Sequence, residues 1–151
     1  MIRCAYSTLV CPSTLRPHPR NPNTHPSAQI EMLAGVIAES GWRHPIIVSK
    51  RSGYVVMGHG RLEAAILLGC ETVPVDYQDF ETEADELAAM VADNRLAELS
   101  VMDREALKDI LCDLDTGEID LDLTGYDSKA LESILAPVND PPTCPHCGGA
   151  L

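Results

Sequence analysis

Residues able to bind an anion stand together at Gly58-His59-Gly60-Arg61, between a short apolar run and a helix-forming segment. Glycine adopts backbone angles that other residues avoid, and it lets the main chain approach a ligand closely. A helix beginning here would offer unpaired N–H groups and the positive end of its dipole, and Arg61 adds donors suited to phosphate oxygens. The motif therefore predicts a phosphate-binding turn, although a plain strand-to-helix connection would use the same residue types.

His59 in this turn has more than one interpretation. The unperturbed pKa of histidine lies close to neutrality, so an imidazolium could contact a phosphate or the ring could act as a general acid or base. The side chain could also simply cap the turn. Because the sequence assigns no partner carboxylate to His59, we rank ligand contact ahead of catalysis.

A second polar group, Asp93-Asn94-Arg95, lies on a predicted acidic helix. Arg95 could grip phosphates, Asn94 could orient a phosphate or a metal-bound water, and Asp93 could hold a cation. Taken alone, such a string more often faces solvent on a helix. If the protein is an enzyme, His59 and Asp93 are the candidate catalytic residues, because one could transfer protons and the other could hold a cation. The sequence does not assign a reaction to them.

The segments around the first motif predict an α/β (α+β) fold with a small mixed sheet. Strands are predicted at residues 7–10, 45–49, 54–57 and 72–76, the middle two forming a hairpin. Helices are predicted to begin after an N-cap at Ser27, to stop at Gly41, and to form again over 61–68. The connection at 16–26 contains four prolines, which exclude a helix there.

Helical patterns continue beyond Phe80. One helix is predicted over 83–99 with an apolar face formed by Leu87, Met90, Val91 and Leu96, a second is capped by Asp103 and runs to residue 114, and a short one spans 127–135. These helices are acidic and lack the basic residues of a DNA-reading helix. We therefore expect a domain at 1–98, an acidic helical extension at 99–137 and a tail at 138–151.

The charge differs between the two parts of the chain. Residues 1–61 hold seven basic and two acidic side chains, whereas residues 62–151 hold four and twenty-one. An acidic protein is a poor candidate for strong non-specific DNA binding, which depends on phosphate neutralisation. A local basic site for one nucleotide is still compatible with this balance, and the acidic part could be a solvated helical surface.

Neither a membrane span nor a secretory signal is recognisable, so we expect a cytoplasmic protein with reduced thiols. In the tail, Cys144 and Cys147 have the spacing of one zinc knuckle. Tetrahedral zinc needs four ligands, and a dimer or the distant Cys4 and Cys11 could supply the others. A flexible tail without Zn²⁺ is an equal alternative.

The order strand, Gly-x-Gly-Arg-x-x-Ala-Ala helix and second strand resembles the ParB/sulfiredoxin-like superfamily. The turn is similar to its nucleotide-phosphate motif, Gly-x-x-Arg-x-x-Ala, and Asp93-Asn94-Arg95 resembles the Glu-Asn-x-x-Arg box of ParB proteins. The loop with Arg20 and Asn21 resembles the Asn-Pro segment before the first helix. The resemblance covers Thr8 to Arg95 and is strongest to short Gly-His-Gly-Arg variants of phage and prophage proteins, many of which bear the label ParB-like nuclease.

The chain also departs from the better-known members. Chromosome-partitioning ParB proteins carry Gly-Glu-Arg-Arg in the first motif, where His59 and Gly60 stand here, and their central DNA-binding helices have no counterpart. The resemblance therefore implies nucleotide binding more directly than the closing of a DNA clamp. Sulfiredoxins place a catalytic cysteine in this turn, and neither residue can replace a thiolate in sulfinic-acid repair.

The resemblance implies a regulatory or DNA-associated module that binds the phosphates of CTP or ATP with Mg²⁺. The implied phosphate ligands are Gly58, His59, Gly60, Arg61, Asn94 and Arg95, with Arg20 and Asn21 nearby. One alternative is an enzyme of the same fold: a nucleotide hydrolase, a small-molecule kinase or a nuclease. Another is an acidic protein-interaction module. Expected partners are a nucleotide, DNA or a DNA-processing protein, and a second copy of the chain, in a bacterial or phage-infected cell without membrane contact.

Overall fold

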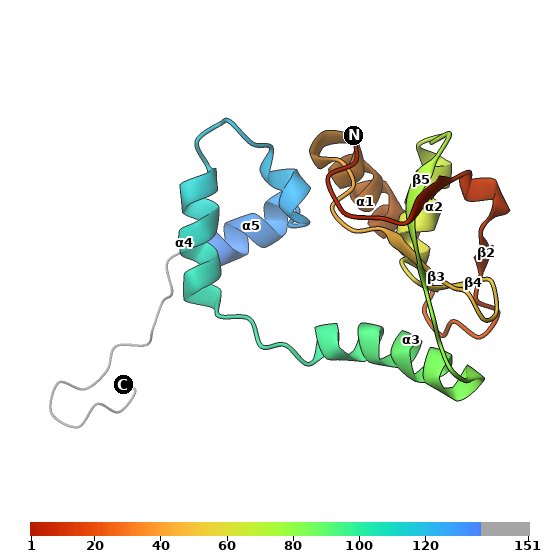
Figure 1. The fold of residues 1–151 in the computed structure, drawn as a ribbon. Helices are drawn as coiled ribbons and strands as arrows, with labels where there is room; N and C mark the ends of the chain where they lie inside the picture. Colours follow the sequence, from red (N-terminus) through yellow and green to blue (C-terminus); the bar gives the residue numbers. More distant parts are fainter. Residues whose placement is uncertain (137–151) are drawn as a thin grey trace, which may run out of the picture. The chain divides into compact units, whose positions relative to one another are not determined.

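The computed structural model describes residues 1–136, which divide into two compact units (Figure 1). The first unit comprises Met1–Val101 with Leu123–Gly125, and the second comprises Met102–Asp122 with residues 126–136. Within the described part, no helix combines the length and apolarity needed to cross a bilayer. Cys144 and Cys147 lie outside the described residues, so the zinc knuckle stays a prediction.

The first unit is built on a five-stranded mixed sheet with the order β1-β5-β3-β4-β2. Its strands are β1 (Thr8–Val10), β2 (Arg16–Pro17), β3 (Ile46–Ser49), β4 (Tyr54–Met57) and β5 (Val73–Gln78). The pairs β1/β5 and β3/β4 are antiparallel, whereas β3/β5 and β2/β4 are parallel. The predicted α/β fold with a small mixed sheet is confirmed, and so is the hairpin of β3 and β4. β2 lies within the proline-rich connection, where no strand was predicted.

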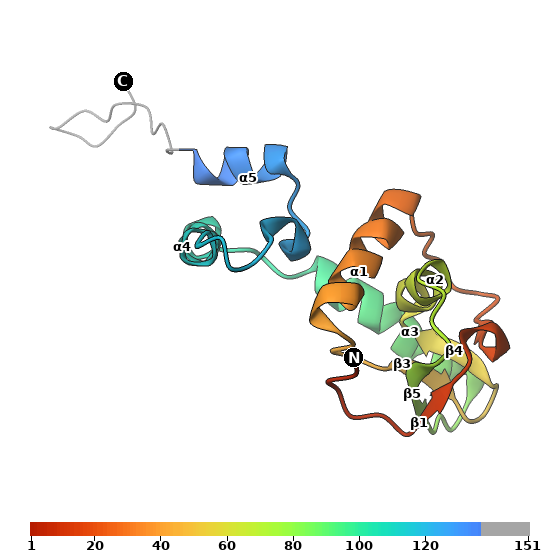
Figure 2. The ribbon, with the colours of Figure 1, turned by 90° about the horizontal axis from the view of Figure 1, so that it is seen from above.

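Helices α1 (Ser27–Ser40) and α2 (His59–Leu67) pack against each other, as Figures 1 and 2 show, and α3 (Glu83–Glu98) contacts β4. A short 3-10 helix, η1 (Pro12–Thr14), follows β1. The core lies between the sheet and helices α1 and α2. It is formed by buried apolar side chains: Ile30, Ala34, Ile37, Trp42, Ile46, Val48, Val55, Leu62, Ala64, Ala65, Val73 and Val75.

The ends of the first two helices differ in part from the prediction. Ser27 is not the N-cap of α1 but its first residue, because Pro26 takes the cap position with extended backbone angles that its ring favours. Gly41 ends the helix as predicted, at φ 75° and with its N–H bonded to the Ile37 carbonyl. α2 begins at His59, two residues before the predicted start, because Gly58 makes the left-handed turn by itself.

The apolar face predicted for α3 is wrong at two positions. Val91 and Leu96 are 53% and 67% exposed, whereas Met90 is buried. The other buried side chain of α3 is Glu86, at 0% exposure. The buried side of the helix therefore includes a carboxylate. Hydrophobic periodicity cannot identify such a position, because it selects only apolar residues.

The second unit contains α4 (Arg104–Leu114) and α5 (Ser128–Leu135), which pack against each other. A 3-10 helix, η2 (Leu121–Thr124), lies in the predicted loop before α5. Asp103 caps α4 by accepting from the backbone N–H groups of Glu105 and Ala106, as predicted. α5 begins one residue after its own cap, Asp127.

Candidate functional site

The turn between β4 and α2 is shaped by the contact of Gly58 with Arg61. Gly58 has φ 92°, in the left-handed region that favours glycine. A Cβ atom added there would lie 3.0 Å from both Nε and Nη2 of Arg61, because the guanidinium folds back over the glycine. Gly58 is also the N-cap of α2 and offers no side-chain cap, so the helix start is open to another acceptor.

The guanidinium of Arg61 is incompletely satisfied by the protein. Its Nε is buried and has no hydrogen-bond partner among the described residues. Burial lowers the pKa of Arg61, and the negative charge of Asp93 opposes that effect. Arginine nevertheless remains protonated in proteins. An unpaired buried donor costs free energy, so this guanidinium would gain by donating a hydrogen bond to an oxyanion from outside the chain.

A cavity of about 220 Å³ opens at this turn. It is lined by three segments: the loop before α1 with the first turns of that helix, the β4–α2 turn, and the second half of α3. The lining residues are Asn21, Asn23, His25, Gln29, Leu33, Gly58, His59, Gly60, Arg61, Asp93 and Asn94. Tertiary structure thus brings the two predicted motifs, more than thirty residues apart in the sequence, to one cavity.

His25 is a cavity residue that the motifs did not identify. A Cβ atom on Gly60 would lie 3.4 Å from its imidazole ring, so the ring packs on the first turn of α2. Its Nδ1 lies 3.1 Å from Oε1 of Gln29, one turn into α1. The signal available in the sequence was the stiff loop at 16–26, which displays histidine and asparagine side chains.

His59 is buried and neutral. Its Nε2 accepts a hydrogen bond of 3.2 Å from the backbone N–H of His18, and the ring also hydrogen-bonds the backbone of Val55. Burial lowers the pKa of His59 to about 4, with the nearby His25 and His18 contributing in the same direction. The ring therefore ties the proline-rich loop to the start of α2. An imidazolium at this position, one of the interpretations of the sequence, does not fit this environment near neutral pH.

A second cavity of about 370 Å³ adjoins the first at Arg61 and Asp93, which line both. Its remaining walls come from the start of β3 and the end of β4: His44, Pro45, Ile47 and Met57. Small-molecule sites commonly measure about 300–1,000 Å³ and are mostly apolar with a few polar groups. The Arg61 guanidinium borders both cavities, and the second has Pro45, Ile47 and Met57 among its walls.

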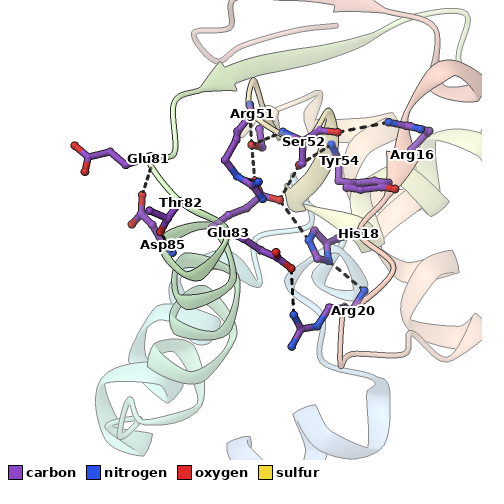
Figure 3. A network of polar contacts seen from close by, with 12 residues as sticks. Arg16, His18, Arg20, Arg51, Ser52, Tyr54, Glu81, Thr82, Glu83 and Asp85 are labelled. Atoms are coloured by element: carbon purple, nitrogen blue, oxygen red, sulfur yellow. Dashed lines mark hydrogen bonds and ion pairs between the residues drawn. The ribbon is translucent and has the colours of Figure 1, made fainter.

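The basic part of the chain pairs with the beginning of the acidic part. The ion pairs are Lys50–Asp79 at 2.7 Å, Arg51–Glu86 at 3.1 Å and Arg20–Glu83 at 3.3 Å. Figure 3 shows Arg20 reaching Glu83, with His18 beside them. By contrast, Arg61 forms no ion pair within the described part of the chain. Three of the seven basic side chains of residues 1–61 are thus paired with carboxylates away from the cavity.

Comparison with known proteins assigns the family. Residues 7–95 match the family described as the ParB N-terminal domain. The chain belongs to the ParB N-terminal domain family. This span agrees with the resemblance predicted from Thr8 to Arg95, which is confirmed. The chain is also 36% identical over 61 residues to the ParB-like nuclease domain-containing protein YnaK of Escherichia coli (strain K12), a match that covers 40% of this chain and 69% of YnaK.

Solved structures of ParB share the fold. The C-terminally truncated chromosome-partitioning protein ParB from Caulobacter crescentus, complexed with CTP-gamma-S, is similar with a TM-score of 0.64 and 21% identity, covering 85% of this chain and 76% of that one. The same truncated ParB complexed to the centromeric parS site has a TM-score of 0.51 and 19% identity, covering 85% and 70%. At these identities the likeness shows the fold alone.

Of the other site residues predicted from the sequence, two line the cavity of this ParB N-terminal domain and two do not. Asn21 lines the cavity but uses its amide within the loop, donating to the Asn23 carbonyl. Asn94 lines it as well and donates to the Met90 carbonyl. Arg95 points elsewhere, to Glu98 at 2.8 Å, and is not a lining residue.

Arg20, a predicted neighbour of the site, also lies outside the lining of the first cavity. Its side chain is 64% exposed and pairs with Glu83. Short-range sequence order could not distinguish these positions, because the direction of each side chain depends on which face of its loop or helix meets the sheet. The roles of Arg20 and Arg95 as phosphate ligands stay predictions.

Proposed function

We propose that the cavity at the β4–α2 turn binds the phosphates of a nucleoside triphosphate, CTP or ATP. The observation that carries the proposal is the buried Nε of Arg61, which lacks a partner in the described protein and lies over Gly58 at an uncapped helix start. A phosphate oxygen would satisfy this donor and the first N–H groups of α2 together. The adjoining cavity at Arg61 supplies space for the nucleoside.

Mg²⁺ would enter with the nucleotide rather than occupy a site made by protein alone. The described residues contain no cluster of three or more His, Cys, Asp or Glu side chains suited to a metal. Mg²⁺ is usually held by one or two carboxylates together with substrate phosphates. Asp93 lines both cavities next to Arg61 and is the carboxylate placed to supply such a ligand.

The module binds nucleotide as a regulatory, DNA-associated protein in this proposal. The neutral ring of His59 already forms hydrogen bonds with His18 and Val55, so it is poorly suited to serve as a general acid. Three cations of the first unit are paired with carboxylates, which disfavours strong direct contact with DNA phosphates. Association with DNA would then be controlled by nucleotide binding or mediated by a partner protein.

The test is thermal unfolding with Mg²⁺ and CTP, ATP or GTP, followed by titration calorimetry. A ligand bound only to the native state at 100 times its Kd adds about 2.7 kcal/mol, which corresponds to roughly 10 °C in Tm. We expect CTP or ATP to produce such a shift and Arg61→Ala to reduce it by about half or more at the same ligand concentration. Arg95→Ala is the comparison variant, because Arg95 is exposed and outside the cavity lining; an unchanged shift would exclude the phosphate-ligand role predicted for it. The absence of any shift in the wild-type protein would refute nucleotide binding.

A further inference from the structure

Glu86 is a fully buried carboxylate outside the cavity. It has 0% exposure, and its oxygens accept hydrogen bonds from the hydroxyls of Ser49 at 2.6 Å and Ser52 at 2.7 Å. Arg51 approaches with Nε at 3.2 Å and Nη2 at 3.1 Å, and Nε2 of His18 lies 3.3 Å away. One side chain of α3 thus holds the β3–β4 hairpin and the proline-rich loop.

The carboxylate is charged in this environment. Burial by itself would raise the pKa of Glu86, but the hydrogen bonds from Ser49 and Ser52 and the charge of Arg51 outweigh burial and hold it below its ordinary value. A buried charge is tolerated only when paired and fully hydrogen-bonded. The site is therefore built for the ionised form, and its donors come from segments far apart in the sequence.

The same bonds continue to the β4–α2 turn through His18. Nδ1 of His18 accepts from the backbone N–H of Arg20, which leaves Nε2 to carry the proton, and Nε2 lies 3.3 Å from Oε1 of Glu86. The backbone N–H of His18 in turn donates to the ring of His59, at the start of α2. Figure 3 shows His18 between the hairpin residues Ser52 and Tyr54 and the loop residue Arg20. A series of polar contacts, from Glu86 to His18 and from His18 to His59, thus joins α3 to the turn.

We propose that Glu86 is a positioning residue that fixes the α3 wall of the cavity relative to its loop wall. Asp93 lies seven residues after Glu86, about two turns or 10 Å farther along α3. Only Glu86 and Met90 of that helix are buried, so few side chains hold its second half in place. The loop wall begins at Asn21, three residues after His18. The relevance of this positioning to ligand binding rests on the function proposed above.

The first test is amide hydrogen exchange on the free full-length chain. Glu86→Gln keeps the size of the side chain but loses the charge that holds Arg51, and the Arg51 side chain, 34% exposed, can turn toward solvent. We expect exchange to accelerate about tenfold or more over both 16–25 and 83–98, with the α1–α2 core unchanged. Glu83→Gln is the matched comparison, because Glu83, three residues away on the same helix, also contacts the loop, through Arg20, but by an exposed ion pair of little expected strength. Acceleration confined to the immediate surroundings of residue 86, or equal in both variants, would overturn the proposal.

The second test compares nucleotide affinity, whichever nucleotide binds the wild-type chain. Glu86→Gln should weaken binding by about tenfold or more, the size of the loss seen when outer-shell partners are removed from metal sites. Val75→Ala, a core variant of β5, controls for lost stability and should retain the affinity of the folded fraction. An equal loss of nucleotide affinity in both variants would mean that Glu86 contributes only to overall stability, which would refute its positioning role. If the wild-type chain binds no nucleotide, the proposed function fails, while the exchange data still decide whether Glu86 couples the two walls.

Discussion

His59 should make the folded protein less stable as the pH falls below about 6.5, and His59→Gln should remove this dependence. Its pKa is about 4 in the folded protein and 6.5 in the unfolded chain, where nothing buries the ring. Because the folded-state pKa is lowered, the unfolded state binds more protons between these values. The contribution is therefore complete above about pH 6.5 and is lost as the pH falls toward 4.

The size of the effect follows from the two pKa values. At pH 5 the unfolded ring is almost fully protonated while the folded ring is still mostly neutral, so stability falls by about 2 kcal/mol relative to pH 7. By pH 4 the loss approaches about 3 kcal/mol. No large discount for solvent screening applies, since His59 is only 8% exposed.

The assay is urea unfolding of the wild-type chain, His59→Gln and the exposed control His44→Gln at pH 7 and pH 5. The wild-type midpoint should fall by roughly 1 M more than that of His59→Gln, in which the amide oxygen can still accept from the His18 N–H. His44→Gln should behave like the wild type, since its side chain lies on the surface. The same pH dependence in the wild type and His59→Gln would refute the buried neutral ring. An NMR titration showing that His59 protonates near pH 6.5 would refute it directly.

Further consequences concern the cavity and α3. Arg61→Ala should weaken nucleotide binding by about 10- to 100-fold, the worth of a charged hydrogen bond, with little loss of fold, whereas Arg95→Ala should leave the Kd unchanged by calorimetry. Gly58→Ala should cost about 1–3 kcal/mol in denaturant unfolding, because the new Cβ meets the Arg61 side chain at φ 92°, and nucleotide affinity should fall with it. Met90→Ala should cost about 2–5 kcal/mol for a buried methionine, whereas Val91→Ala on the exposed side should change the unfolding midpoint little; equal losses would contradict the orientation of α3.

Local patterns predicted most elements of the first unit because they are determined by short-range chemistry. β-branched runs separated by a turn predicted the hairpin of β3 and β4, and Gly41 predicted the end of α1. The start of α1 was misplaced by one residue, because a proline can occupy a cap position without a side-chain hydrogen bond. The short strand β2 was missed because its pairing with β4 depends on a distant partner.

The face of α3 shows the limit of periodicity. Apolar spacing selected Val91 and Leu96, which are exposed, and could not select Glu86, which is buried. A carboxylate is normally expected at the surface. Its burial depends on donors from Ser49, Ser52 and Arg51, and these meet Glu86 only when the hairpin and α3 come together.

The sequence by itself determined the family, the mixed fold and the identity of the turn from Gly58 to Arg61, because these depend on residue order and on backbone angles open to glycine. Only the tertiary structure decided which other side chains share the cavity. It brought in His25 and Asp93, turned Arg95 toward Glu98, and made His59 a neutral structural ring. The physical reason is that burial, side-chain direction and pKa depend on neighbours contributed by distant segments, whereas helix and turn signals are carried by adjacent residues.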